Sequence, residues 1–401
     1  MTECPTCNKG RKQCTDCNEW LCISSDICMQ TLLQSYEFVE PCRSYGGHIL
    51  NLSSKFIPDL GVLQTIHTLN LSNTTISDVR MLYNVRSLNL SGCRNLRDVS
   101  PLGRIYDLDL SNTLISNVND LGGVHTLNLS YCPNIKNVQS LGGVHTLWLI
   151  ACQGITDVSS LGKVNTLHLT ACKNISDVSA LKRVHTLWLS NVTIPHNVLS
   201  HGIKNIHTLT SNHQLDLSFT SIRDVRYFCN IHTVYLIDCQ EVVDVSSLGR
   251  VHTLNLSYCK KVIDVSALGG VQHLILTSTN VTDVSALGNV PLLNLSGCDK
   301  IVDFSLLQNV HTLDLSYTNV NDVSTLGGVH TLNLSNCNYV MDVSALSHVH
   351  SLDLSLTNVS DVSALTNVHT LNLSNCLHVH DIRALKNVSK IMLKGCSYVL
   401  S

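Results

Sequence analysis

Alternating apolar and polar residues recur along the chain in short blocks with the pattern Val-His-Thr-Leu-x-Leu-Ser. This alternation is the period of a β-strand, so that Leu127 and Leu129 face inward while Asn128 faces outward. The first leucine of the block returns every 19 or 20 residues, apart from one longer step between Leu187 and Leu215. A strand this short cannot bury its own leucines, and the pattern therefore predicts a stack of about 18 rungs stabilised by neighbouring rungs.

The remainder of each unit predicts how the chain returns to the next strand. A Cys or Thr column ends the strand, where a short side chain can satisfy a buried turn amide. An Asp-Val-Ser-x-Leu stretch follows, and its Asp, as at Asp157, should accept amide hydrogen bonds at the start of a short 3₁₀ turn. Since 19 or 20 residues leave no room for a long helix, we expect a parallel sheet inside and 3₁₀ or irregular structure outside.

The Leu-x-Leu core followed by Cys or Thr resembles the leucine-rich-repeat family, whose hallmark is LxxLxLxxN/C. The resemblance covers roughly residues 48–398. It implies an α/β solenoid, a horseshoe with the parallel β-sheet on its concave face. The predicted organisation is a solenoid over residues 48–401, with an irregular insert near 192–214, preceded by a cysteine-rich segment over residues 1–47.

Departures from the repeat predict where a partner binds. The inner-face position between the two leucines is Asn or Asp in most units, but three consecutive units carry aromatic residues there. Neighbouring parallel strands lie about 4.8 Å apart, so these residues should form one strip, and aromatic residues on a solvated sheet face are typical of binding sites. The alternative is that large residues drifted onto a tolerant face. The predicted partner-binding residues are Trp148, Ile150, His168, Thr170, Trp188, Tyr235 and Ile237.

Histidine is enriched directly before the strands, where eleven of the 20 histidines lie. We interpret them as neutral rings packed along the sheet edge; the alternative is an acid-sensitive or metal-decorated edge. The repeated Asp is interpreted as a turn cap rather than a calcium ligand, and the Cys column as buried thiols. The eleven histidines are His67, His125, His145, His185, His207, His232, His252, His311, His330, His350 and His369.

The repeat pattern contains no candidate catalytic residues. Ser and His recur in nearly every unit, whereas a nucleophile or base selected for chemistry would be singular. No phosphate loop, HExxH or GxSxG motif is present. The chain is therefore predicted not to be an enzyme and to have no small-molecule substrate.

Cysteines crowd the first 47 residues, beginning with two Cys-x2-Cys pairs six residues apart. Such spacing is typical of zinc ligands, with a disulfide cluster as the alternative. One scheme assigns Cys4, Cys7, Cys22 and Cys28 to one ion, and Cys14, Cys17 and Cys42, with His48, to another. The segment is similar to cross-braced MYND, B-box and RING-like fingers, which implies zinc as the cofactor.

Charge and composition limit the partners. The net charge is -3, no long basic run is present, and no stretch of 18 apolar residues could span a membrane, so nucleic acid and membrane are disfavoured. The first residues lack the apolar segment of a secretory signal, and Asn-Leu-Ser acceptors inside the strands would crowd the sheet if glycosylated, which favours the cytoplasm or another reducing compartment. The predicted function is an adaptor that binds a protein on the concave face. The alternatives are a ubiquitin-ligase-type substrate receptor whose zinc module recruits machinery, and a nucleic-acid-associated protein that uses the zinc module.

Overall fold

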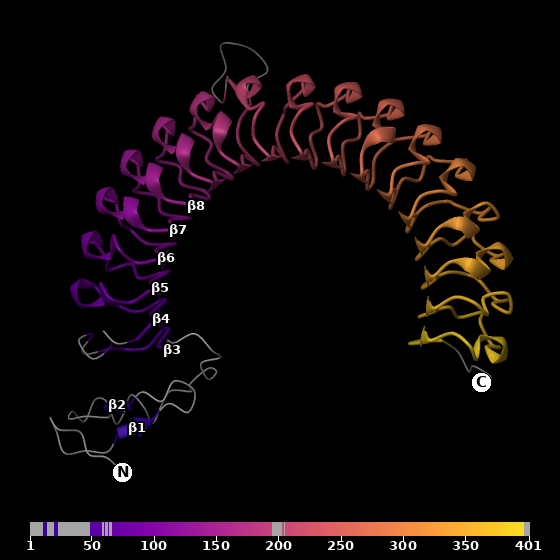
Figure 1. Ribbon diagram of the computed structural model, residues 1–401, viewed down its shortest axis with the longest axis horizontal. Coiled ribbons are helices and arrows are strands. Elements are labelled where there is room, and N and C mark those ends of the chain that lie inside the picture. Colours follow the sequence, from indigo (N-terminus) through magenta and orange to yellow (C-terminus); the bar gives the residue numbers. More distant parts are fainter. Residues whose placement is uncertain are drawn as a thin grey trace. The chain divides into compact units, whose positions relative to one another are not determined.

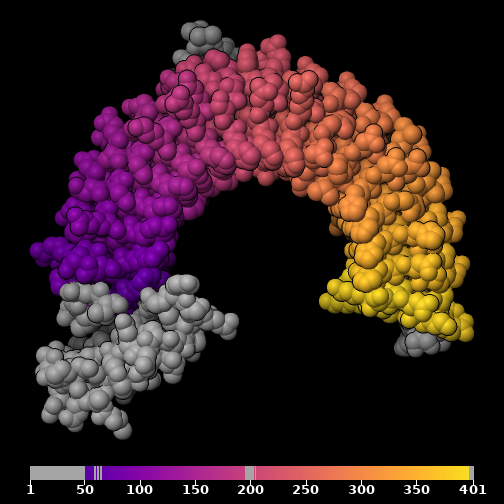
Figure 2. Space-filling model, viewed as in Figure 1, coloured from indigo at the N-terminus to yellow at the C-terminus, as the bar shows by residue number. Residues whose placement is uncertain are grey.

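The computed structural model describes residues 11–13, 20–22, 49–57, 60, 63, 66–194, 203 and 205–396. The chain forms two compact units, Met1–Leu187 and Trp188–Ser401. Within each unit the rungs stack directly against one another, as the ribbon and space-filling views show (Figures 1 and 2). In the part of the chain that is described, no helix has the length and apolar character needed to cross a membrane.

The first unit holds a parallel sheet whose strands pair in exact sequence order. Its leucines stand opposite one another, as in the pairs Leu108–Leu127 and Leu127–Leu147. The strands are β3 (Ile49–Asn51), β4 (Thr68–Asn70), β5 (Ser87–Asn89), β6 (Asp107–Asp109), β7 (Thr126–Asn128), β8 (Thr146–Trp148) and β9 (Thr166–His168). The 3₁₀ helices are η2 (Arg80–Leu82), η3 (Ser100–Leu102), η4 (Asn119–Gly123), η5 (Gln139–Gly143), η6 (Ser159–Lys163) and η7 (Ser179–Arg183). Before them, β1 (Arg11–Gln13) pairs antiparallel with β2 (Trp20–Cys22).

The second unit repeats this arrangement after β10 (Thr186–Trp188), which contains the boundary between the units. Its strands are β11 (Gln214–Asp216), β12 (Thr233–Tyr235), β13 (Thr253–Asn255), β14 (His273–Ile275), β15 (Leu292–Asn294), β16 (Thr312–Asp314), β17 (Thr331–Asn333), β18 (Ser351–Asp353), β19 (Thr370–Asn372) and β20 (Lys390–Met392). Its 3₁₀ helices are η8 (Ile206–Thr208), η9 (Arg226–Phe228), η10 (Ser246–Leu248), η11 (Ser266–Gly270), η12 (Ser285–Leu287), η13 (Ser305–Leu307), η14 (Leu326–Gly328), η15 (Ser344–His348) and η16 (Arg383–Leu385). Together with β3–β10 these make the 18 predicted rungs among the described residues.

The core lies between the strands and the returning 3₁₀ turns. Leu127 and Leu129 of the β7 rung are both 0% exposed, which confirms the inward direction predicted from the alternation. The same rung also buries Cys132, Ile135, Val138, Leu141 and Val144. Each rung thus places a layer of aliphatic side chains against the rungs on either side, and this burial is the main stabilising contribution.

The Cys and Thr column is buried as predicted, and its side chains bond to a backbone carbonyl as well as to turn amides. Thr113 Oγ1 donates a hydrogen bond of 2.7 Å to the carbonyl oxygen of Leu110. Cys132, one rung further on, donates from Sγ to the same oxygen over 3.2 Å. Backbone N–H groups of Thr113 and Asn112 also bond to the Cys132 thiol, which partly offsets the rise that burial causes in its pKa. The predicted turn amides are therefore satisfied as well. Burial also raises the pKa of Cys152 to about 12, so its thiol stays protonated.

The repeated Asp caps the 3₁₀ turn, as predicted. Asp157 Oδ1 accepts the backbone N–H of Ser159 at 2.9 Å, and Asp264 and Asp342 make the equivalent bonds. This hydrogen bond lowers the pKa of Asp157, because it stabilises the ionised carboxylate. Among the residues whose placement is known, no group of three or more His, Cys, Asp or Glu side chains could hold a metal ion.

Histidines that precede the strands stack ring on ring along the sheet edge. The rings of His125 and His145 have centroids 4.6 Å apart and planes within 9°, and Tyr106 stacks on the other side of His125. Both rings also lie beside a threonine hydroxyl: Nδ1 of His125 is 3.2 Å from Thr126 Oγ1, and Nδ1 of His145 is 3.2 Å from Thr146 Oγ1. The predicted packing along the edge is confirmed. In the second unit the longest such stack runs through His311, His330, His350 and His369.

One histidine was assigned to the wrong position. His207 lies in η8, not before a strand, and its ring is tilted against Tyr227. His213 occupies the position before β11 instead and stacks on His232 with ring centroids 4.4 Å apart. The sequence His-Thr-Leu at residues 207–209 copies the repeat, but the longer step from Leu187 places a turn there.

Candidate functional site

The inner-face Asn and Asp residues have a structural task that the sequence pattern did not reveal. Asn128 Oδ1 accepts the backbone N–H of Ser130 at 3.0 Å, two residues further on. The chain then turns through a residue with positive φ, which is Tyr131 (φ 59) in this rung. Such side-chain turns are a known property of Asn and Asp. The polar residue at this position therefore closes the strand into its turn.

A large side chain at the inner-face position does not accept the backbone N–H two residues further on, as Asn128 does. At Trp148 the amide of Ile150 is accepted instead by Ser130 Oγ of the preceding rung, at 3.3 Å. The Tyr235 rung uses the same substitute, since Ile237 N donates to Ser218 Oγ at 3.1 Å. The bond that closes these two rungs therefore comes from the preceding rung rather than from the inner-face side chain.

Trp148 and His168 form an aromatic platform on the inner face. They stand opposite one another on β8 and β9, with ring centroids 5.4 Å apart and planes within 20°. Both are half-buried, and burial lowers the pKa of His168 to about 4. At neutral pH the ring of His168 is consequently uncharged and extends the apolar surface of Trp148.

The structure distributes the remaining predicted site residues over both units. Ile150 and Thr170, each half-buried, follow Trp148 and His168 along their rungs in the first unit. Trp188 opens the second unit, and Tyr235 with Ile237 lies further along that unit on the inner face of the β12 rung. Of the aromatic strip predicted over three strands, the contact between Trp148 on β8 and His168 on β9 lies within the first unit. Of the irregular insert predicted near 192–214, residues 195–202 and 204 lie outside the described residues.

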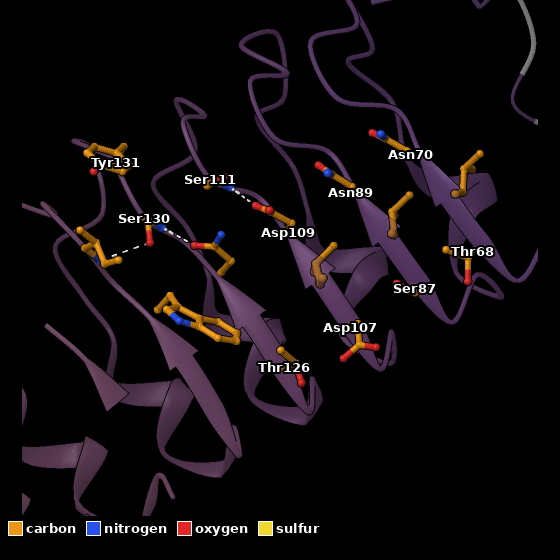
Figure 3. A pocket seen from close by; sticks show the side chains of 16 residues that line it. Thr68, Asn70, Ser87, Asn89, Asp107, Asp109, Ser111, Thr126, Ser130 and Tyr131 are labelled. Atoms are coloured by element: carbon orange, nitrogen blue, oxygen red, sulfur yellow. Dashed lines mark hydrogen bonds between the residues drawn. The ribbon is translucent and has the colours of Figure 1, made fainter. Parts of the chain in front are cut away.

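Next to the platform the inner face of the first unit is hollowed over β4 to β8. The hollow has a volume of about 630 Å³ and reaches from Thr68 to Ile150 (Figure 3). Its lining consists mainly of hydroxyl, amide and carboxylate side chains, with Tyr131 and Trp148 as the aromatic members. The polar lining residues on β4 to β7 form a polar row, which lies beside the apolar platform.

Two carboxylates on β6 give this hollow its charge. Asp107 and Asp109 both line it, and the lining includes no Lys or Arg. Asp107 occupies a position that is Thr or Ser in most rungs, so this departure from the repeat was visible in the sequence and was missed. The hollow is accordingly suited to a ligand that carries positive charge.

The predicted zinc ligands are not placed. Cys4, Cys7, Cys14, Cys17, Cys28, Cys42 and His48 lie outside the described residues, and for Cys22 only the backbone, in β2, is described. The zinc-binding segment stays a prediction.

Comparisons with known proteins identify the class of fold. No family model matches the chain, and no curated protein matches it. Among solved structures, the mouse RP105/MD-1 complex is similar with a TM-score of 0.58 and 15% identity over 84% of this chain and 72% of that one. Two internalin structures from Listeria monocytogenes are also similar at 20% identity. One is the InlJ functional domain with its cysteine ladder (TM-score 0.48, 77% of this chain and 73% of that one), and the other is inlF (TM-score 0.41, 85% and 89%).

The fold is a leucine-rich-repeat solenoid, as the parallel strands, the 3₁₀ turns and the Cys and Thr column indicate together. This agrees with the resemblance stated from the sequence. The likeness concerns the fold.

Proposed function

We propose that this protein is a non-enzymatic interaction scaffold that holds a protein partner on the inner face of its first unit. The platform of Trp148 and His168 forms the centre of the contact, and the polar row over β4 to β7 forms its rim. The observation that carries the proposal is that Trp148 replaces a residue whose side chain closes the strand in other rungs. A half-buried aromatic residue on the inner face of a sheet, in place of the residue that the other rungs use, is typical of a binding hot spot.

The shape of the surface favours a protein over a small molecule. The hollow crosses five strands, which corresponds to a length of about 19 Å at the spacing of parallel strands. An apolar centre with a polar margin is the usual anatomy of a protein–protein interface. Catalysis is not part of the proposal, because most cysteines among the described residues of the solenoid are buried, and burial raises the pKa of thiols such as that of Cys172.

Replacing Trp148 with Asn is expected to abolish partner capture while the fold persists. Asn is the residue that other rungs use here, and it restores the bond to the amide two residues on. Proteins retained from a lysate of the source cells by the wild-type chain should fall by about tenfold or more with the variant, as measured by quantitative mass spectrometry.

The matched control is Val302→Asn, at a position that is 88% exposed in the segment before η13 of the second unit. It should retain the same proteins as the wild type. Undiminished capture by Trp148→Asn, with circular dichroism unchanged in both variants, would contradict the proposal.

We further propose that residues 1–47 bind zinc through the two Cys-x2-Cys pairs and the cysteines that follow. Elemental analysis of the purified chain should find one or two zinc ions, and Cys4→Ser with Cys7→Ser should remove about one of them. Finding no zinc in protein purified without chelator, together with disulfides that reduction removes, would contradict this.

The free thiols among the described residues suit a reducing compartment such as the cytoplasm. Ubiquitin-transfer machinery or nucleic acid as a partner of the segment would be distinguished by a ubiquitin-discharge assay and a gel shift.

A further inference from the structure

Asp107 and Asp109 place two negative charges on one face of a single strand. They are separated by one residue of β6, so both side chains point to the inner face, and both are half-buried. Ser111 N–H bonds to Oδ1 of Asp109 at 2.8 Å, which leaves Oδ2 for another donor. Among the described residues, the ion pairs involve neither carboxylate. A cationic group of a partner would therefore meet both carboxylates without competing for an existing pair.

The acidic strand stands at a fixed distance from the aromatic platform. Asp109 is in register with Asn128, and Asn128 with Trp148, so two strand spacings separate the carboxylate from the indole. That distance is about 9.6 Å. A polyproline II helix advances about 9.3 Å in three residues and returns to the same face after each three. In an extended β-strand, side chains on the same face are about 6.8 Å or about 13.6 Å apart, and neither distance matches the separation of the two anchors.

The residue between the two anchors offers the matching hydrogen bond. Asn128 Oδ1 is engaged by Ser130 N–H, so its amide can present Nδ2 as a donor. A polyproline II backbone exposes carbonyl acceptors, and its prolines carry no N–H. In the second unit two of the equivalent amides bond to a neighbouring carboxylate: Asn294 Nδ2 to Asp314 Oδ2 at 3.3 Å and Asn372 Nδ2 to Asp353 Oδ2 at 2.8 Å. Among the described residues of the first unit, Asn128 Nδ2 and the Asp109 carboxylate are not bonded to one another, so both can meet a ligand.

We propose that the partner contributes a basic polyproline II segment that lies across β6 to β8 of the first unit. Its Arg or Lys binds between Asp107 and Asp109, and an aromatic side chain three residues away stacks on Trp148. This proposal rests on the proposed function, because it specifies the chemistry of the partner for the same surface.

The test is fluorescence anisotropy of the full chain with two fluorescein-labelled peptides, Gly-Arg-Pro-Pro-Phe-Gly and Gly-Phe-Pro-Pro-Arg-Gly, which present the motif in both directions. At least one should bind, and binding should weaken at high salt because the contact is partly ionic. Replacing Arg with Glu, or moving Phe to the second position after Arg, should each weaken binding by about fivefold or more.

Variants of the protein separate the contributions. Asp109→Asn keeps the closing bond of its rung, and the double variant Asp107→Thr with Asp109→Asn restores the residues of other rungs. Both variants should weaken peptide binding, by about fivefold for the double variant. Trp148→Asn should weaken it as well. The matched control is Asp314→Asn at the equivalent position of β16 in the second unit, and it should leave binding unchanged.

Equal binding of the Arg and Glu peptides, or the absence of binding by either Arg peptide, would overturn the proposal of a basic segment. If Trp148→Asn still abolished capture of the cellular partner in that case, the interaction scaffold would stand and only the chemistry of the segment would be wrong. If neither peptide binding nor capture depended on Trp148, both proposals would fail.

Discussion

The Leu127→Ala variant is expected to lose about 3 kcal/mol of unfolding free energy, because it leaves a cavity in a closely packed rung. Leu127 is 0% exposed, and its neighbours in register are Leu108 and Leu147. Since each rung is stabilised by the adjoining rungs, one cavity weakens two interfaces at once. Guanidinium unfolding followed by circular dichroism measures the loss, and hydrogen exchange should locate it in the first unit.

Leu114→Ala provides the control in the same unit. Leu114 is 38% exposed, and its backbone carbonyl, which accepts Asn134 Nδ2 at 3.0 Å, is retained by alanine. This variant should change the stability by no more than about 0.5 kcal/mol. Equal losses in the two variants would show that the paired leucines do not form the core.

Acid is expected to destabilise the protein as the pH falls from about 6.5 toward 4, with His168 as a principal cause. Burial lowers the pKa of His168 to about 4 in the folded chain. The unfolded chain therefore takes up a proton at this residue at a higher pH than the folded chain does, and protonation favours unfolding. Above pH 7 the residue is neutral in both states and contributes no such difference.

His168→Asn should remove this contribution. At pH 5 the variant should regain about 1 to 2 kcal/mol of unfolding free energy relative to its difference from wild type at pH 7.5. Burial and the neighbouring rings of His252 and His213 also lower the pKa of His232, so part of the acid sensitivity should remain. Urea unfolding at both pH values measures the effect, and an identical pH dependence of the two proteins would contradict it.

The fold could be predicted from the sequence because the repeat states the same local rule many times. The Leu-x-Leu pattern gave the direction of Leu127 and Leu129, and the Asp-Val-Ser stretch gave the turn capped by Asp157. Position 207 shows where this reasoning ended. There the motif His-Thr-Leu was present, but the longer step from the preceding rung changed the element that it forms.

Hydrogen bonds between rungs could not be predicted, because they depend on which backbone group faces inward. The sequence indicated that the column satisfies turn amides, but it did not indicate that Thr113 and Cys132 both donate to the carbonyl of Leu110. Likewise, Asn128 reads as a solvent-exposed residue in the alternation, whereas its side chain closes the turn. Period alone gives the face of a residue but not its bonding partner.

The candidate site was predicted in part. The departure at Trp148 and His168 from the repeat was recognised, and the structure places their rings together. Asp107 replaces the Thr or Ser that most rungs have at this position. The replacement was overlooked, since carboxylates are common on solvated surfaces. Its significance follows only from the hollow that it shares with Trp148.

A photoreactive benzoyl-phenylalanine in place of Tyr131 tests most directly whether the partner sits on this inner face. Tyr131 lines the hollow and is 60% exposed, so the substitution places the reactive ketone beside any bound chain. Irradiation should give one covalent adduct with the cellular partner. The same group at Val302, which is 88% exposed in the segment before η13 of the second unit, should give none. A partner that crosslinks from position 302 but not from position 131 would contradict the account.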